Sequence, residues 1–189
     1  MYLEVSKTIE IVANYSISAE RKIVLRSLID FIKGKIENKQ EVRLNLICTH
    51  NSRRSHLSQI WAQTMAHHFN IQNVFCYSGG TEATAMFPKV PETLRKQGFK
   101  IQKLSATPNP VYAVKYDENE PAVVCFSKTF DDDFNPNSQF AAIMTCSSAD
   151  EGCPFIAGAE VRLPIRYDDP KAFDGTDLMD AKYAERSLE

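Results

Sequence analysis

The sequence predicts an α/β fold in which a parallel β-sheet packs against helices. Short apolar runs typical of strands alternate with longer segments of helical periodicity from residue 42 onward. Such alternation favours a parallel sheet whose strands are joined by right-handed crossovers. A length of 189 residues and a hydrophobic content of 43% are sufficient for one domain with an extended core.

Residues 1–40 are predicted to form a helical extension ahead of the main domain, which spans residues 41–189. Ser18 resembles a helix N-cap, and the helix that it starts is expected to end after Gly34. Apolar residues recur along one face of this helix: Ile23, Leu25, Leu28, Ile29 and Ile32. We interpret the extension as a helix pair that packs on the domain or forms a homodimer. The alternative is a regulatory element.

The main domain is predicted to alternate between strands and helices. The strands cover about residues 42–47, 73–77, 141–145 and 160–163. The helices cover about residues 55–69, 88–97 and 177–188, and Gly98 ends the second of them. All of the strands are expected to belong to one sheet.

An insertion at about residues 107–137 interrupts this alternation. Two strand-like runs, 111–116 and 122–126, flank an acidic, turn-like stretch, which is typical of a β-hairpin. Consecutive aspartates at 131–133 follow the hairpin. We interpret them as an exposed, solvated loop, and cation binding is the alternative.

Composition and charge exclude several classes of protein. A net charge of −2 gives no indication of nucleic-acid binding. The apolar runs are too short to span a membrane, and the N-terminus lacks the charged-then-apolar pattern of a signal peptide. We therefore expect a cytoplasmic protein. The chain has five cysteines, and this odd number argues against a framework of disulfides. Because no two of them form a Cys-x2-Cys pair, we predict no zinc or other metal site.

The stretch from Cys48 to Ser55 is the strongest indication of chemistry. A thiol at the end of a predicted strand is followed by a short loop and a helix start. Loop amides and a helix N-terminus that point at one spot form a cradle for a tetrahedral oxyanion, and Arg54 can add two matched donors. The same positive field favours the nucleophilic thiolate form of Cys48. The alternative is an inert, buried Cys48 with two surface arginines; Cys76 and Cys125 lie in apolar runs and are interpreted as core residues.

Three stretches point to a family. The pattern Cys-x5-Arg-Ser, with Asn51 inside the loop, resembles the low-molecular-weight protein tyrosine phosphatases and the thioredoxin-coupled arsenate reductases that share their fold. Residues 77–83 resemble the second-strand segment of this family, and Asp169-Pro170 resembles its late Asp-Pro pair. The resemblance covers about residues 42–180.

A fourth stretch distinguishes the two branches of the family. Residues 146–154 closely resemble the redox segment of the arsenate reductases, with Cys146 and Cys153 as its two thiols, and plain tyrosine phosphatases of this fold lack this pair. Cys146 also ends a predicted strand parallel to the one that ends at Cys48, so both thiols are expected at one edge of the sheet. Seven residues of intact helix separate α-carbons by ~10 Å, whereas a disulfide tolerates ~4.4–6.8 Å, so the segment must unwind to oxidise. Two unrelated structural cysteines are the alternative.

The resemblance implies a three-layer α/β fold of the low-molecular-weight phosphatase type, in which helices flank a central four-stranded parallel sheet. It implies that Cys48 is the nucleophile and Asp169 the general acid, with Asp168 as the alternative acid. It implies that the whole loop binds the oxyanion: Thr49, His50, Asn51, Ser52, Arg53, Arg54 and Ser55. Lys171 and Ala172 stand where the phosphatases often carry two tyrosines, which weakens the expectation of an aryl phosphate substrate.

The function that this resemblance implies is reduction of arsenate to arsenite. Cys48 attacks arsenate, Cys146 and Cys153 relay the disulfide, and thioredoxin is the external reductant, with no bound cofactor. The alternative is a low-molecular-weight phosphatase that hydrolyses phosphate monoesters through a cysteinyl-phosphate. A third possibility is a redox sensor in which the 146–153 pair signals to a partner. The complete set of Cys48, Arg54 and Asp169 argues against a sensor.

Overall fold

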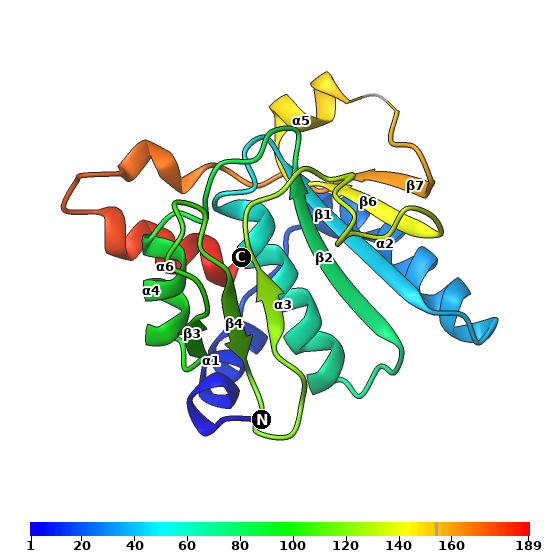
Figure 1. Cartoon of the computed structure of the whole chain (residues 1–189). Helices are drawn as coiled ribbons and strands as arrows, with labels where there is room; N and C mark the ends of the chain where they lie inside the picture. Colours follow the sequence, from blue (N-terminus) through cyan, green and yellow to red (C-terminus); the bar gives the residue numbers. More distant parts are fainter. Residues whose placement is uncertain (154) are drawn as a thin grey trace.

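The computed structural model describes residues 1–153 and 155–189, and Pro154 of the expected redox segment lies outside the described residues. A parallel four-stranded sheet in the order β2-β1-β6-β7 forms its centre (Figure 1). The strands are β1 (Val42–Cys48), β2 (Val74–Gly80), β6 (Phe140–Met144) and β7 (Ala159–Pro164). The predicted α/β fold with a four-stranded parallel sheet is confirmed.

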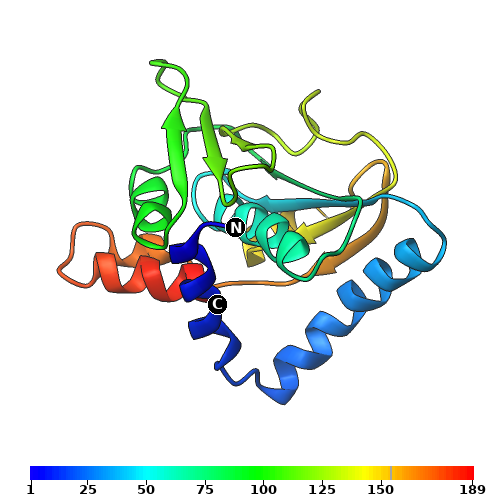
Figure 2. The same ribbon diagram turned by 90° about the horizontal axis from the view of Figure 1, so that it is seen from below.

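Helices and loops cover both faces of this sheet. The helices are α1 (Leu3–Ala13), α2 (Ala19–Glu37), α3 (Arg54–His68), α4 (Lys89–Lys96), α5 (Ser147–Gly152) and α6 (Met179–Leu188), with a 3-10 turn, η1, at Pro170–Phe173. Leu44 and Leu46 of β1 pack on the face covered by α2 and α3, while Ile47 packs on the opposite face near α5. Figure 2 shows the same sheet from below, with the long helix α2, drawn in blue, beside it. Because strand side chains alternate between faces, burial on both faces explains the continuous apolar run in β1.

The N-terminal extension packs on the main domain. Val5 and Ile9 of α1 are buried in the same core cluster as α3 and α4 residues. The side chain of Ser18 caps α2 by accepting a hydrogen bond from the Arg21 amide, as predicted. Within the described residues, no helix is both long and apolar enough to cross a membrane.

The apolar face predicted for α2 is partly wrong. Leu25, Leu28 and Ile32 pack against the sheet, but Ile23 is 74% exposed and Ile29 is 43% exposed. The three partly buried residues follow the spacing of a single narrow stripe, and the other two lie outside it. Helical periodicity alone did not show how narrow the contact of α2 with the sheet is.

The predicted hairpin is part of a three-stranded sheet. Strands β4 (Tyr112–Lys115) and β5 (Val123–Cys125) are antiparallel, and β3 (Lys100–Lys103), which precedes the insertion, adds a third strand in the order β3-β4-β5. Strand β3 was not predicted because Ile101 is its only apolar residue. This second sheet packs its buried residues into the cluster formed by α1, α3 and α4.

Candidate functional site

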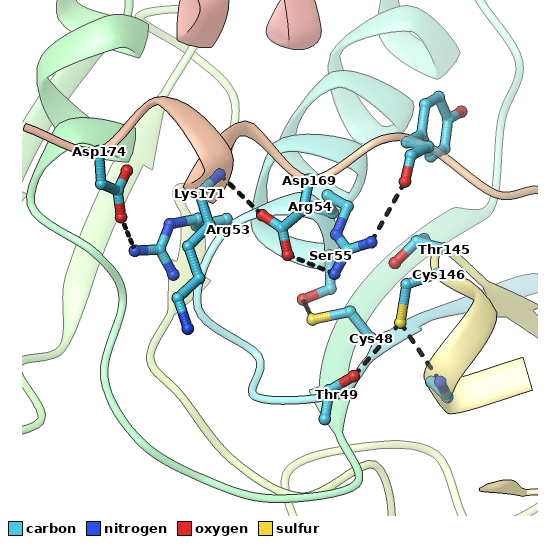
Figure 3. A network of polar contacts seen from close by, with 12 residues as sticks. Cys48, Thr49, Arg53, Arg54, Ser55, Thr145, Cys146, Asp169, Lys171 and Asp174 are labelled. Atoms are coloured by element: carbon cyan, nitrogen blue, oxygen red, sulfur yellow. Dashed lines mark hydrogen bonds and ion pairs between the residues drawn. The ribbon is translucent and has the colours of Figure 1, made fainter. Parts of the chain in front are cut away.

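The loop between β1 and α3 lies at the carboxyl edge of the parallel sheet, where Cys48 ends β1 and Arg54 begins α3 (Figure 3). The Cys48 side chain is buried, and its Sγ lies 3.1 Å from Ser55 Oγ. A cavity of about 180 Å³ opens in front of it. Its lining combines the loop with two other segments: Cys48, Thr49, His50, Ser52, Arg53, Arg54, Ser148, Asp169 and Lys171.

The loop carbonyl groups point away from this cavity. Those of residues 48, 49, 50 and 52 accept hydrogen bonds of 2.8–3.1 Å from surrounding groups: the amides of Thr81, Glu82 and Phe87 and the hydroxyl groups of Thr81, Thr84 and Ser127. In a trans peptide the next N–H points the opposite way, so the amides of residues 49, 50, 51 and 53 face inward. Among the described residues none of these amides has a protein acceptor. The loop therefore presents converging donors suited to an oxyanion.

Asn51 holds the loop in this conformation. Its backbone has φ +43°, a left-handed geometry that asparagine tolerates better than most residues. The buried side chain accepts a hydrogen bond from the Lys128 amide at 2.9 Å and donates to Ser55 Oγ at 2.8 Å. Because Ser55 Oγ accepts from Asn51, its own hydrogen is free to donate to Cys48 Sγ. This chain of hydrogen bonds aims a hydroxyl donor at the sulfur of Cys48.

The end of β2 supports the loop from below and requires glycine. A Cβ at Gly80 would lie 2.3 Å from the carbonyl oxygen of Glu82 and 2.7 Å from the Asn51 amide nitrogen. Those atoms belong to the backbone and cannot move aside cheaply. The segment 77–83, singled out from the sequence, is thus where β2 and the loop make their closest approach.

Asp169 lies over the loop beside Arg54. Arg54 donates from Nη2 to Asp169 Oδ2 at 2.6 Å and from Nη1 to the Tyr167 carbonyl at 3.2 Å. The Lys171 amide donates to Asp169 Oδ1 at 3.0 Å, which orients the carboxylate. The alternative acid, Asp168, has a side chain that is 90% exposed and lines no part of the cavity.

Arg53 lines the cavity, but its guanidinium group is already engaged elsewhere. It donates to Asp174 Oδ2 at 2.5 Å and to the Tyr183 hydroxyl at 2.6 Å, and it lies 3.9 Å from the centre of the Phe87 ring. The expectation that the Arg53 side chain binds the oxyanion therefore does not fit its contacts. Sequence reasoning missed Asp174 and Tyr183 altogether, since neither belongs to a motif.

The remaining loop residues contribute mainly their backbone. The His50 side chain is half-exposed and lies 3.8 Å from the Glu82 carboxylate. Below the loop, His56 is fully buried with its Nδ1 3.2 Å from Ser78 Oγ. Burial and the nearby Lys128 charge lower the pKa of His56 to about 3, so this side chain is neutral.

Cys146 and Cys153 lie at opposite ends of α5. Cys146 is buried beside the loop, with Sγ 3.4 Å from Thr49 Oγ1, and it caps α5 by accepting from the Ala149 amide at 3.4 Å. Cys153 is half-buried at the C-terminal end of the same helix. The structure thus brings Cys146 next to the residue that follows Cys48, while an intact helix separates it from Cys153. No group of three or more potential metal ligands occurs among the described residues.

Comparisons with known proteins agree with this architecture. No protein-family model and no curated protein matches the sequence. The fold is similar to that of a low-molecular-weight phosphotyrosine phosphatase from Vibrio cholerae, with a TM-score of 0.51 and 14% identity over 78% of this chain and 88% of that chain. This likeness confirms the predicted fold type and shows the fold alone.

Two arsenate reductases are also similar at a lower level. One, in a phosphate-binding state, has a TM-score of 0.43 and 16% identity over 77% of this chain and 93% of that chain. The other, a thioredoxin-dependent arsenate reductase from Corynebacterium glutamicum, has a TM-score of 0.40 and 16% identity over 97% of this chain and 79% of that chain. Scores this low add nothing to the fold assignment.

Proposed function

We propose that this protein is a thioredoxin-linked arsenate reductase that uses three cysteines. The observation that carries the proposal is the position of the Cys146 thiol, which is buried 3.4 Å from the hydroxyl of Thr49, the residue after Cys48. A hydrolase that releases its product with water has no need of a second thiol at that point. A reductase does, because a thiol must take the place of water.

The first step is attack of the Cys48 thiolate on arsenate held by the loop amides and Arg54. A sulfur–arsenic bond forms, and one arsenate oxygen leaves as water after Asp169 supplies a proton. Cys146 then attacks Cys48 Sγ and breaks the sulfur–arsenic bond. Its electron pair remains on arsenic, which leaves as arsenite, and the oxidised product is a Cys48–Cys146 disulfide.

The second exchange transfers the disulfide to α5. Cys153 attacks Cys146, which forms the 146–153 disulfide and releases Cys48 as a thiol. In the reduced protein Cys146 and Cys153 lie at opposite ends of α5, so the helix must unwind for this bond to form. Thioredoxin, a dithiol reductant of the cytoplasm, restores both thiols, and the relay requires no bound cofactor.

A phosphatase acting on phosphate monoesters is the second candidate. The set of Cys48, Arg54 and Asp169 favours it, because these residues also suit phosphoryl transfer. Lys171 at the cavity wall argues against an aryl substrate, because an exposed ammonium group offers no flat surface for a ring.

Thioredoxin-coupled consumption of NADPH with arsenate tests the proposal. We expect sustained turnover by the intact protein, loss of turnover in Cys146→Ser and Cys153→Ser, and normal turnover in Cys125→Ala, which removes a buried thiol outside the site. Mass spectrometry of Cys153→Ser should detect a trapped Cys48–Cys146 disulfide. If arsenate gives no turnover while all four proteins hydrolyse p-nitrophenyl phosphate equally, the phosphatase is correct.

A further inference from the structure

Two neighbouring arginines of the loop hold the two ends of one short segment. Arg53 and Arg54 point in opposite directions (Figure 3). Arg54 binds Asp169 at 2.6 Å, and Arg53 binds Asp174 at 2.5 Å. The segment between these aspartates contains η1, and Asp169 and Lys171 of this segment line the cavity. It is therefore tied to the loop both before and after η1.

Arg53 belongs to a ring of three hydrogen-bonded side chains that is mostly buried. Arg53 Nε donates to the Tyr183 hydroxyl at 2.6 Å, and that hydroxyl donates to Asp174 Oδ1 at 2.6 Å, completing a ring of three groups. Tyr183 is fully buried and stacks on Phe87, whose ring also contacts the guanidinium. Burial raises the pKa of Tyr183, so its hydroxyl keeps the proton that it donates.

The contact made by Arg54 cannot persist through the reaction. Once an oxyanion occupies the loop, the Arg54 guanidinium turns its paired donors to the anion, and Asp169 must be free to reach the departing oxygen. Of the two loop arginines, Arg53 alone then still holds the segment that carries Asp169. Arg53 has no need to change partner, because both of its acceptors lie outside the cavity lining.

We propose that the side chain of Arg53 positions the general acid and does not bind the oxyanion: through Asp174 and Tyr183, it keeps the Asp169 segment on the loop while Arg54 exchanges Asp169 for the oxyanion. This inference rests on the first chemical step of the proposed function, which the reductase and the phosphatase share. It assigns the two loop arginines separate tasks, one of binding and one of alignment.

The dependence of rate on the leaving group tests this role. Phenyl phosphate needs protonation of its departing oxygen more than p-nitrophenyl phosphate does. We expect Arg53→Met to lower kcat about 10- to 100-fold on phenyl phosphate and less than about 5-fold on p-nitrophenyl phosphate, with phosphate inhibition unchanged. Asp174→Asn should behave similarly, and Arg53→Lys should recover part of the loss. The control Lys89→Met breaks an ion pair between α4 and α6 outside the site and should affect both esters equally.

A second measurement does not depend on turnover. Hydrogen exchange of residues 168–178 is followed with and without saturating inorganic phosphate. The wild type should stay protected in both states, whereas Arg53→Met should lose protection when phosphate binds. The proposal would be overturned if phosphate-bound wild type and phosphate-bound Arg53→Met showed equal protection of these amides from exchange. It would also be overturned if Arg53→Met lowered kcat equally on both esters and weakened inhibition by phosphate. If the wild type binds phosphate but turns over neither ester nor arsenate, the proposed function fails while exchange still decides the role of Arg53. If the wild type binds no phosphate, both proposals are wrong.

Discussion

Helix α5, between Cys146 and Cys153, is held by Asp150, which pairs with two arginines, and we expect these ion pairs to limit how readily the helix unwinds. The side chain of Asp150 on α5 is only 6% exposed and lies 2.5 Å from Arg162 Nη2 and 2.8 Å from Arg166 Nε. Arg162 also donates to the Cys153 carbonyl at 2.9 Å, which anchors the end of the helix. We therefore expect Asp150→Asn to release α5 and to accelerate formation of the 146–153 disulfide.

The magnitude follows from the burial of this carboxylate. A hydrogen bond to a charged group contributes about 1.5–3 kcal/mol, and the partial exposure of both arginines reduces that value, so we expect α5 to lose about 1–2 kcal/mol of local stability. Because about 1.4 kcal/mol corresponds to a factor of ten, the unwound population should rise about 5- to 30-fold. If unwinding precedes disulfide formation, the rate should rise by the same factor.

The assay uses a Cys48→Ser background, so that Cys146 can pair only with Cys153 within the relay. Reduced protein is mixed with oxidised glutathione, quenched with an alkylating reagent and scored by mass spectrometry for the 146–153 disulfide. Glu151→Gln is the matched control, because it removes the same charge from an exposed position on the same helix. Equal rates in Asp150→Asn and Glu151→Gln would refute the reasoning.

Two further predictions concern the loop and its buried support. Gly80→Ala should weaken phosphate binding at least about 10-fold in a calorimetric titration, because the added Cβ would meet the backbone of Glu82 and Asn51. The control is Gly34→Ala, which should bind phosphate normally because a Cβ at that position meets nothing within 4 Å. Normal binding by Gly80→Ala would contradict the close approach. His56 has a pKa lowered to about 3 by burial, so the unfolded chain binds more protons between about pH 6.5 and 3, and stability should fall as the pH drops through that window. Urea unfolding should show that the free energy of unfolding falls by about 2–3 kcal/mol from pH 7 to 4.5, and that His56→Gln removes most of this fall. If His56→Gln loses as much stability as the wild type, the titration of His56 is not the cause.

Much of the fold followed from local patterns in the chain. The four parallel strands, the cap at Ser18 and the strand–loop–helix around Cys48 each occupy a short stretch in which residue type and spacing suffice. Strand β3 was missed because a half-exposed edge strand with one apolar residue has no such pattern. The exposure of Ile23 was not predicted, because helical periodicity identifies the apolar face of a helix but not how much of that face the rest of the protein covers.

The candidate site likewise has one part that local sequence patterns predict and another part that they do not. The residues of the loop could be recognised from the sequence, since a cysteine, an asparagine and an arginine occur at these spacings within eight residues. The tertiary contacts were needed to show that Asp169 rather than Asp168 faces Arg54, and that Arg53 binds Asp174. Those pairs join residues more than a hundred positions apart. Their formation depends on how α6 and η1 pack against the loop, and no local spacing encodes that packing.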